Sequence, residues 1–358
     1  MKNALAIGLM SGSSLDGLDL ALARFSNDEG RYHYHIETAE TLPYPVRWHD
    51  KLANAFLSTP KDLVPLDKEY GTWLGQQVSA FAERHGVKPD FVASHGHTVF
   101  HKPEQRYTLQ IGDGQALADA CGFTVVNDFR SEDVSKGGHG APLVPIGDKM
   151  LFSDYDICLN IGGIANLSYE HNGKRIAYDI CIANQALNWL TQREGFNYDK
   201  DGGMARQGHT VPTLLEVLND NGFFHQHAPK SLGREFFETF QKATLESYPT
   251  NDALSTFVEH IALQIAYAVA NLPQGRILVT GGGAHNIYLM ERLRQHTQHH
   301  VVISDRQTVD YKEALIFAFL GLLRLEGRIN VLSSVTGASS DSCSGKIWHP
   351  HLKRNKRV

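Results

Sequence analysis

The chain has 358 residues, of which 42% are hydrophobic and 20% charged, a balance too apolar for a disordered chain and typical of a globular protein. The 34 Lys and Arg residues against 39 Asp and Glu residues give a net charge of −5, which argues against nucleic acid or an anionic membrane as the main partner. The longest apolar run, from Ala314 to Leu323, is too short to cross a hydrocarbon core of about 30 Å.

The length favours two domains over one hydrophobic core. Four cysteines have neither the paired spacing of a metal site nor the density of a disulfide scaffold, and they fit a reducing cytoplasm. They are Cys121, Cys158, Cys181 and Cys343.

The first half of the sequence predicts three consecutive strands followed by helices and shorter strands. Alternating large and small side chains and the glycine turns between them indicate the strands. The predicted strands are 4–10, 18–25, 31–41, 91–94, 107–111 and 124–127, and the predicted helices are about 45–57, 65–85 and 114–121.

The second half begins in the same way, with three strands around two turns and then a helix. Its strands are 156–160, 166–170, 175–179 and 276–280, and its helices are about 184–194, 252–271, from 286 and 311–325. The long helix places Leu254, Phe257, Val258, Ile261, Ile265 and Val269 on one face, which is expected to be core. The repeated β-β-β-α order predicts two similar lobes with a cleft between them.

Three glycine-rich turns directly follow apolar strands: Gly8–Ser14, Asn160–Asn166 and Thr280–Asn286. Glycine lets backbone N–H groups approach an anion closely, as a phosphate-binding loop requires, although hairpin turns also use glycine for steric reasons. None of the three matches the dinucleotide or P-loop pattern. Two hairpin loops, one per lobe, and a third between strand and helix resemble the ATP site of the acetate and sugar kinase, Hsp70 and actin superfamily.

A closer resemblance is to the anhydro-N-acetylmuramic acid kinases. The stretch 8–19, GLMSGSSLDGLD, is similar to that family's first phosphate motif, G-x-M-S-G-T-S-x-D-G-x-D. Further matches follow in the same order from residue 7 to about 338. They are Ser94–Val99 with His101, Thr108–Asp113, Asp128–Arg130, Gly137–Pro145, Asn160–Asn166, Tyr198–Gly202 and Thr280–Gly283.

The resemblance implies a two-lobed α/β fold of the actin-like ATPase type, with duplicated β-β-β-α-β-α-β cores. It places the first lobe at 1–130 plus about 336–358 and the second at 131–335. It also implies a cytoplasmic, Mg²⁺-dependent homodimer that uses ATP. Such an enzyme opens the 1,6-anhydro bridge of anhydro-N-acetylmuramic acid with water and phosphorylates O6, giving N-acetylmuramic acid 6-phosphate for cell-wall recycling.

Two carboxylates match the family's catalytic positions. An inverting hydrolysis needs a carboxylate that activates water, and the phosphoryl group that captures O6 replaces a general acid. Asp179, at the end of the predicted third strand, matches the catalytic aspartate, although residues 180–183 read Ile-Cys-Ile-Ala where the family has Thr-Gly-Pro-Gly. Glu313 matches a glutamate that helps to hold the attacking water. Alternatively, Asp179 caps the next helix and Glu313 only favours a helix dipole.

The phosphate sites implied by the resemblance lie on the three turns. Because carboxylates beside a triphosphate require a divalent cation, Asp16 is the candidate Mg²⁺ ligand, and Asp19 is either a cofactor residue or structural. The cofactor-binding candidates are Gly12, Ser13, Ser14, Asp16, Gly17, Asp19, Gly162, Gly163, Gly281, Gly282 and Gly283.

The sugar is expected to contact Ser94, His95, Gly96 and Thr98, which end a predicted strand of the first lobe. Arg130 is expected either to bind the lactyl carboxylate or to form a salt bridge with a neighbouring aspartate. Gly137–Gly140 is similar to the crossover between the lobes, where glycine serves a hinge or a ligand contact.

Two alternatives share the glycine turns. The first is a kinase of the same superfamily acting on another sugar or carboxylate, which the altered residues 180–183 would favour. The second is a non-enzymatic, ATP-gated protein related to actin or to the chaperones.

Overall fold

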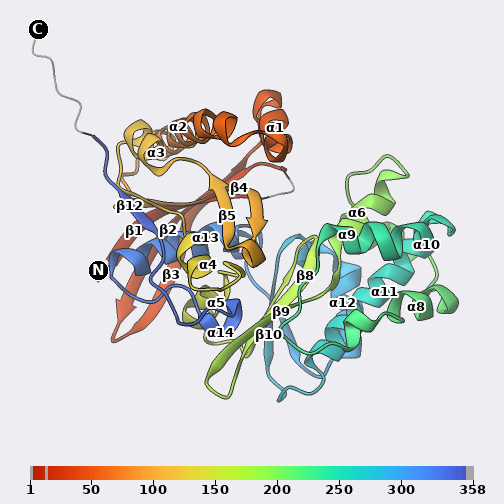
Figure 1. Cartoon of the computed structure of the whole chain (residues 1–358). Coiled ribbons are helices and arrows are strands. Elements are labelled where there is room, and N and C mark those ends of the chain that lie inside the picture. The colour runs from red at the N-terminus through yellow and green to blue at the C-terminus, as the bar shows by residue number, and fades with distance from the viewer. Residues whose placement is uncertain (1–2, 13–14, 352–358) are drawn as a thin grey trace, which may run out of the picture. The chain divides into compact units, whose positions relative to one another are not determined.

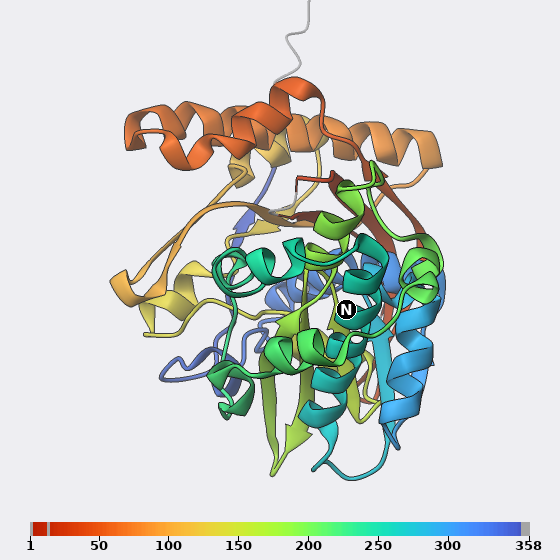
Figure 2. The ribbon, with the colours of Figure 1, turned by 90° about the vertical axis from the view of Figure 1, so that its right-hand side faces the viewer.

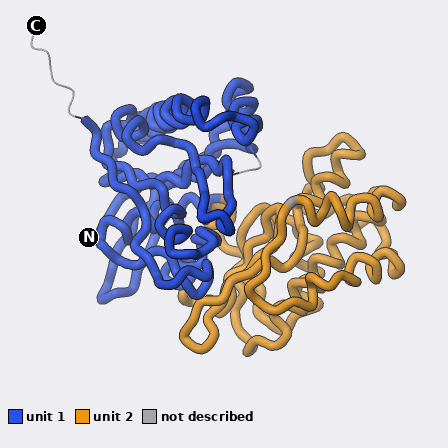
Figure 3. Tube along the Cα trace, in the orientation of Figure 1, with its two compact units in different colours: residues 1–151, 311–358 blue, residues 152–310 orange. Residues whose placement is uncertain are grey.

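The chain folds into two units, the first formed by residues 1–151 and 311–358 and the second by residues 152–310 (Figure 3). The computed structural model describes residues 3–12 and 15–351, so Ser13 and Ser14 lie outside the described residues. The predicted boundaries at 130/131 and 335/336 differ from this division. Residues 131–151 belong to unit 1, and so does the helix after Tyr311, whose Phe319 packs against Phe25 and Tyr32 of the unit's sheet.

Unit 1 contains a mixed sheet in which three antiparallel strands are followed by parallel neighbours. Strands β1, β4 and β6 run parallel, and β5 adds an antiparallel hairpin to β4. The order across the sheet is β3 (Arg31–Leu42), β2 (Leu18–Asp28), β1 (Asn3–Ser11), β4 (Phe91–Lys102), β6 (Val125–Asn127) and β12 (Lys346–Trp348), with β5 (Tyr107–Ile111) off this path.

Unit 2 repeats this arrangement. Its first three strands are antiparallel, and β10 and β11 then add in parallel to β7. The order is β9 (Lys174–Ile182), β8 (Ile164–His171), β7 (Ile157–Ile161), β10 (Arg276–Thr280) and β11 (His300–Ile303). In both units the third strand is the edge and the first pairs with the fourth. The duplicated β-β-β-α-β-α-β core is therefore confirmed.

Helices cover both faces of the sheet in unit 1 (Figure 1). One face packs against α1 (Val46–Ala53), α2 (Pro60–His85) and α3 (Gly114–Cys121). The other face packs against α13 (Arg306–Leu325), with Phe319 against Phe25 and Tyr32. The helix α2 begins at Pro60, before the predicted residue 65, because the Thr59 side chain accepts a hydrogen bond from the Asp62 N–H and caps it.

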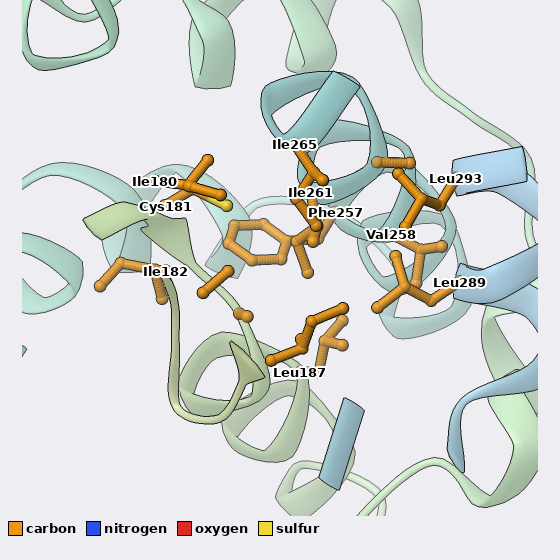
Figure 4. Packing of buried hydrophobic residues seen from close by; sticks show 14 of the residues in the cluster. Ile180, Cys181, Ile182, Leu187, Phe257, Val258, Ile261, Ile265, Leu289 and Leu293 are labelled. Atoms are coloured by element: carbon orange, nitrogen blue, oxygen red, sulfur yellow. The ribbon is translucent and has the colours of Figure 1, made fainter. Parts of the chain in front are cut away.

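The core of unit 2 lies between its sheet and the helices α6 (Asn184–Gln192), α11 (Thr250–Val269) and α12 (Ile287–His296) (Figures 2 and 4). The six side chains predicted for the apolar face of α11 are each 0–1% exposed, so their assignment to the core is confirmed. Further helices of unit 2 were not predicted, namely α7 (Gly203–Gln207), α8 (Pro212–Asn219), α9 (Arg234–Phe236) and α10 (Lys242–Glu246). Among the described residues, no helix is both long and apolar enough to span a membrane.

Gly8 sets the distance between β1 and α13. A Cβ at this position would lie 1.9 Å from the carbonyl oxygen of Ala314 and 3.0 Å from the Ala318 nitrogen. These neighbours are backbone atoms, so they cannot move aside as a flexible side chain can.

We expect Gly8→Ala to lower the free energy of unfolding by about 2 kcal/mol or more, since overpacking a rigid contact forces backbone shifts. Gly203→Ala is the control, because its Cβ would meet only an Asp199 oxygen at 4.0 Å. Urea unfolding of both variants tests this. Equal midpoints for Gly8→Ala and the unsubstituted chain would contradict the packing.

Candidate active site

Two glycine turns of unit 2 lie side by side at the carboxyl ends of neighbouring strands of its sheet. Strands β7 and β10 run parallel with Asn160 opposite Thr280, so the turns that follow them emerge together, as at the carboxyl ends of other parallel strands. A Cβ on Gly281 would lie 2.6 Å from Asn160 Oδ1. The second and third predicted turns therefore contact each other.

These turns contain glycines of two kinds. Gly281 has φ +82°, and a Cβ on Gly283 would lie 2.3 Å from the Ile161 side chain, so conformation and packing require both glycines. Gly162, Gly163 and Gly282 have no left-handed φ, and the nearest protein atoms to their Cβ positions lie 3.5, 3.9 and 3.5 Å away. The protein itself does not need glycine at these three positions, and the bare backbone leaves room for an anion.

Asn184, at the start of α6, joins the second turn to the end of β9. Its Nδ2 donates to the Ile161 carbonyl at 3.1 Å and its backbone N–H donates to the Gly162 carbonyl at 3.1 Å. The Ala183 N–H donates to the Gly163 carbonyl at 2.8 Å. Asn184 was not among the predicted site residues, although it directly follows the altered residues 180–183.

The prediction that Asp179 ends its strand is wrong, since β9 continues to Ile182. After a register shift opposite Ala165 and Asn166, Cys181 pairs with Ala165 and Ile182 with Ile164. The reason lies in the sequence: the Ile-Cys-Ile run is compatible with a buried strand, whereas the family's Gly-Pro-Gly would end it.

The Asp179 side chain is half-buried and directly hydrogen-bonded. Its Oδ2 accepts from the Leu232 N–H at 2.8 Å, and its own N–H donates to the Lys230 carbonyl at 3.1 Å. Burial raises the pKa of Asp179 above its ordinary value, and the Leu232 N–H opposes that rise. The alternative that Asp179 caps the next helix does not hold, because the residue at the α6 N-cap is Ala183.

In unit 1 the first glycine turn follows a serine with three hydrogen-bonding partners. Ser11 Oγ lies 2.7 Å from Tyr44 OH, 3.1 Å from Tyr70 OH and 3.0 Å from His97 Nδ1. Burial lowers the pKa of His97 to about 4, so the ring is neutral at pH 7. Tyr44 and Tyr70 were not predicted as site residues, because they reach Ser11 only through the packing of α2 and the end of β3.

The turn itself closes with a hydrogen bond from the Leu15 N–H to the Gly12 carbonyl at 3.3 Å. Asp16 is exposed. Asp19 accepts from Thr41 Oγ1 at 2.6 Å, and a Cβ on Gly17 would lie 2.7 Å from the Leu42 carbonyl. Gly17 and Asp19 therefore have structural contacts with β3, and Asp16 points to solvent beside the turn.

Residues 94–98 lie inside β4, not at its end as predicted. The pairing with β1 shifts between Leu9 and Ser11, so that Ser11 pairs with His97, and from His97 onward β4 also pairs with β5, with His97 opposite Ile111. Gly96 makes this change possible, since it has φ +73° and its Cβ would lie 2.6 Å from the Ile111 carbonyl. Ser94 and His95 are buried, and Thr98 is half-buried.

Arg130 bonds to a histidine and a carbonyl. Its Nη2 and Nε lie 2.8 and 3.1 Å from His95 Nε2, and Nη1 donates to the Gly140 carbonyl. Because His95 Nε2 accepts, its proton resides on Nδ1. Burial and Arg130 lower the pKa of His95 far below its usual value, so the ring is neutral. Burial also lowers the pKa of Arg130 to about 10, against the opposing effect of Glu313 and Asp133.

Glu313 follows a break in α13, where Tyr311 has φ −119° and ψ 16°. Burial raises the pKa of Glu313, while Lys312 and Arg130 act to lower it. Lys312 Nζ is itself 2.7 Å from Asp148 Oδ1, and both side chains are 5% exposed. Glu313 is thus a second carboxyl group that burial makes more basic.

The segment Gly137–Gly140 lies wholly within unit 1, so its assignment to the crossover is wrong. The Gly140 N–H donates to Asp133 Oδ2 at 2.7 Å, and Thr336 Oγ1 donates to Asp133 Oδ1 at 2.7 Å. A buried carboxylate therefore fixes this loop in place.

The topology and the glycine turns define the class: the protein has the two-lobed α/β fold of the sugar kinase, Hsp70 and actin type. The anhydro-N-acetylmuramic acid kinase family model matches residues 4–350. The relative from Vibrio cholerae, an anhydro-N-acetylmuramic acid kinase, is 37% identical, with 98% of this chain and 99% of the relative covered. The relative of the same name from Pseudomonas fluorescens is 35% identical over 96% and 99%.

The chain belongs to the anhydro-N-acetylmuramic acid kinase family, which confirms the resemblance noted in the sequence. It is a phosphotransferase that acts on a hydroxyl acceptor, as predicted. A more distant likeness is to the solved structure of a ROK family glucokinase from Streptomyces griseus in complex with glucose and AMPPNP. That structure is 13% identical with a TM-score of 0.41, covering 88% of this chain and 98% of that chain.

Gly163→Ala is expected to weaken ATP binding by about tenfold or more, because a methyl group would occupy the space that a phosphate needs, while leaving the urea midpoint unchanged. Isothermal titration with ATP measures the first quantity. Gly281→Ala is the opposite case, because its φ of +82° strains an alanine and stability should fall. Unchanged affinity in Gly163→Ala would remove the turn from the nucleotide site.

Proposed function

We propose that the protein is an ATP-dependent anhydro-N-acetylmuramic acid kinase. It adds water across the 1,6-anhydro bridge and phosphorylates O6, and the product, N-acetylmuramic acid 6-phosphate, serves cell-wall recycling. Within the structure, one observation carries the proposal. A half-buried carboxylate, Asp179, lies on β9, and Ala183 and Asn184, which follow this strand, donate backbone hydrogen bonds to the turn at Gly162 and Gly163.

Asp179 is the proposed base. An inverting hydrolysis needs a carboxylate that takes a proton from water on the face opposite the leaving oxygen. Burial makes Asp179 more basic, and the Leu232 N–H favours its ionised form, so the group can be both ionised and an effective proton acceptor at neutral pH. The leaving O6 forms its new bond to the γ-phosphorus of ATP as its bond to C1 breaks, and the bond from that phosphorus to the bridging oxygen breaks so that ADP leaves. Glu313 is the proposed second carboxylate, which orients the attacking water.

The nucleotide is assigned to the glycine turns. Gly162, Gly163 and Gly282 offer backbone without side chains, and Gly281 and Gly283 shape the adjoining turn. Gly12, with Ser13 and Ser14 outside the described residues, completes the set in unit 1. We propose that the residues of unit 1 contribute the sugar contacts and that unit 2 contributes the base.

The residues present fit Mg²⁺ in only one way. Among the described residues, no three His, Cys, Asp or Glu side chains are grouped as a metal site. Mg²⁺ commonly keeps several waters and takes one or two carboxylates together with substrate phosphates, which suits the exposed Asp16 beside the phosphate turn. When bound there, the ion would neutralise phosphate charge.

The sugar is assigned to Ser94, His95, Gly96, Thr98 and Arg130. The neutral His95 holds two nitrogens of the Arg130 guanidinium, which leaves Arg130 its positive charge for the lactyl carboxylate of the substrate. A histidinium at position 95 would instead repel it. We also propose that the enzyme is a homodimer of the cytoplasm.

Asp179→Asn is expected to abolish turnover while ATP affinity and the unfolding midpoint stay unchanged, because it removes the proton acceptor and almost no volume. A positioned general base contributes about 10²–10⁴-fold. Steady-state kinetics with the anhydro-sugar and ATP titration measure both quantities. A variant that keeps more than about a tenth of the turnover would show that Asp179 is not the base.

Turnover in ¹⁸O-water should place one labelled oxygen at C1 of the sugar product, because water is the nucleophile at that carbon. Mass spectrometry of the product, with fragmentation to locate the label, reads this out. A kinase that phosphorylates a free hydroxyl of another sugar or carboxylate would give an unlabelled product. That result, together with no activity on the anhydro-sugar, would exclude the proposed reaction.

A further inference from the structure

A segment of unit 2 that no motif singled out runs along the edge strand β9 beside Asp179. The strand order leaves β9 at the edge of its sheet. Lys230 accepts the Asp179 N–H through its carbonyl at 3.1 Å, and Leu232 donates its N–H to Asp179 Oδ2 at 2.8 Å. Residues 230–232 therefore contact both the backbone and the carboxylate of the proposed base.

The Lys230 side chain connects this segment to residues 223 and 224. Its Nζ donates to the Phe223 carbonyl at 3.1 Å and to the Phe224 carbonyl at 3.5 Å. The same Nζ lies 4.6 Å from the centre of the Phe223 ring and 5.7 Å from that of Tyr178. Two carbonyls and two aromatic faces thus surround the ammonium group, which is a favourable environment for a cation partly removed from water.

One of the two aromatic rings around the Lys230 ammonium group, that of Tyr178, belongs to β9. Tyr178 directly precedes Asp179, and its hydroxyl donates to the Ala268 carbonyl at 3.2 Å, next to the end of α11. Lys230 consequently connects three pieces of backbone: the turn at 223–224, β9, and its own segment. Among the described residues Lys230 forms no ion pair with a carboxylate, so its charge is used for this connection.

We propose that Lys230 is a positioning residue: its ammonium group holds the segment 223–232 against β9, so that the Leu232 N–H fixes the Asp179 carboxylate in the orientation that accepts a proton. This inference rests on the proposed function, in which Asp179 is the base. Lys230 acts through Leu232 and is not itself in contact with the reacting atoms.

The ionisable side chains around the Asp179 carboxylate are mostly neutral, so the hydrogen bond from the Leu232 N–H has a strong influence on the pKa of Asp179. On β9, burial raises the pKa of Cys181 far above its usual value and that of Tyr178 to about 12. On β8, burial also raises the pKa of Tyr169, which acts on Tyr178. On α11, His260 packs against Phe224 with a pKa of about 3. All four are neutral at pH 7.

Among the described groups named here, Lys230 carries the charge, and burial lowers its pKa. Burial of Asp179 favours its protonated form, and the Leu232 N–H favours the ionised form. If the segment loosens, that hydrogen bond weakens and the pKa of Asp179 rises. Since a base works only above its pKa, the acid limb of the pH profile should move to higher pH.

The test uses the full-length chain with Lys230→Met, which keeps the length of the side chain and removes the ammonium group. We expect kcat to fall about tenfold or more, since small misplacements of a reacting group are costly, with the KM for ATP nearly unchanged. The acid limb of kcat/KM should move up by about half a unit or more. Lys230→Arg should restore most of kcat and the normal limb, because it keeps the cation.

Lys242→Met is the matched control. Lys242 Nζ lies 5.8 Å from the Trp189 ring centre and 2.7 Å from Glu238 Oε2, so it is another lysine over an aromatic ring, in a different part of unit 2. Its kinetics and pH profile should match the unsubstituted enzyme. If Lys230→Met does not fold, Lys230→Gln is compared with Lys230→Arg by the same measurements.

A normal acid limb in Lys230→Met or Lys230→Gln, whatever the value of kcat, would overturn the positioning role. Asp179→Asn separates this failure from that of the proposed function. If Asp179→Asn is inactive and the lysine variants have normal profiles, only the positioning inference is wrong. If Asp179→Asn stays active, Asp179 is not the base and the inference falls with it.

Discussion

The parallel pairing of β7 with β10 is the constraint on which the candidate site depends. It sets Asn160 opposite Thr280. Two glycine turns separated by more than a hundred residues therefore emerge together at the carboxyl ends of these strands. Unit 1 repeats the principle with β1 and β4, which bring Ser11 beside His97. In both units the first strand of the repeat carries a glycine turn, and its parallel neighbour supplies the residues beside that turn.

The space around the glycines and the burial of the ionisable groups distinguish the residues near these strand ends. Gly8, Gly281 and Gly283 are glycine because protein atoms or a positive φ exclude any side chain, whereas nothing in the protein excludes one at Gly163. Burial in turn changes the pKa values of the ionisable groups. It makes Asp179 and Glu313 more basic and keeps His95 and His97 neutral. Burial thus produces two carboxyl groups of raised pKa and two histidine rings that are neutral at pH 7.

The altered residues 180–183 change the path of the chain without removing Asp179 from the site. Isoleucines on either side of Cys181 extend β9, and the register shift absorbs one residue. Because β9 is an edge strand, its free side accepts the segment around Lys230. A neighbour distant in sequence thereby supplies the N–H that holds the carboxylate, where the family motif would have placed a turn.

The sequence alone determined the repeated strand order, the buried face of α11 and the family, because alternation, helical periodicity and glycine turns are local patterns. It could not place Tyr44, Tyr70, Leu232 or Lys230, whose roles come from contacts between segments far apart in the chain. The predicted ends of β4 and β9 were also wrong, because pairing with β5 and β8 determines how far each strand continues. Local chemistry named Asp179, and only tertiary packing decided what surrounds its carboxylate and hence its basicity.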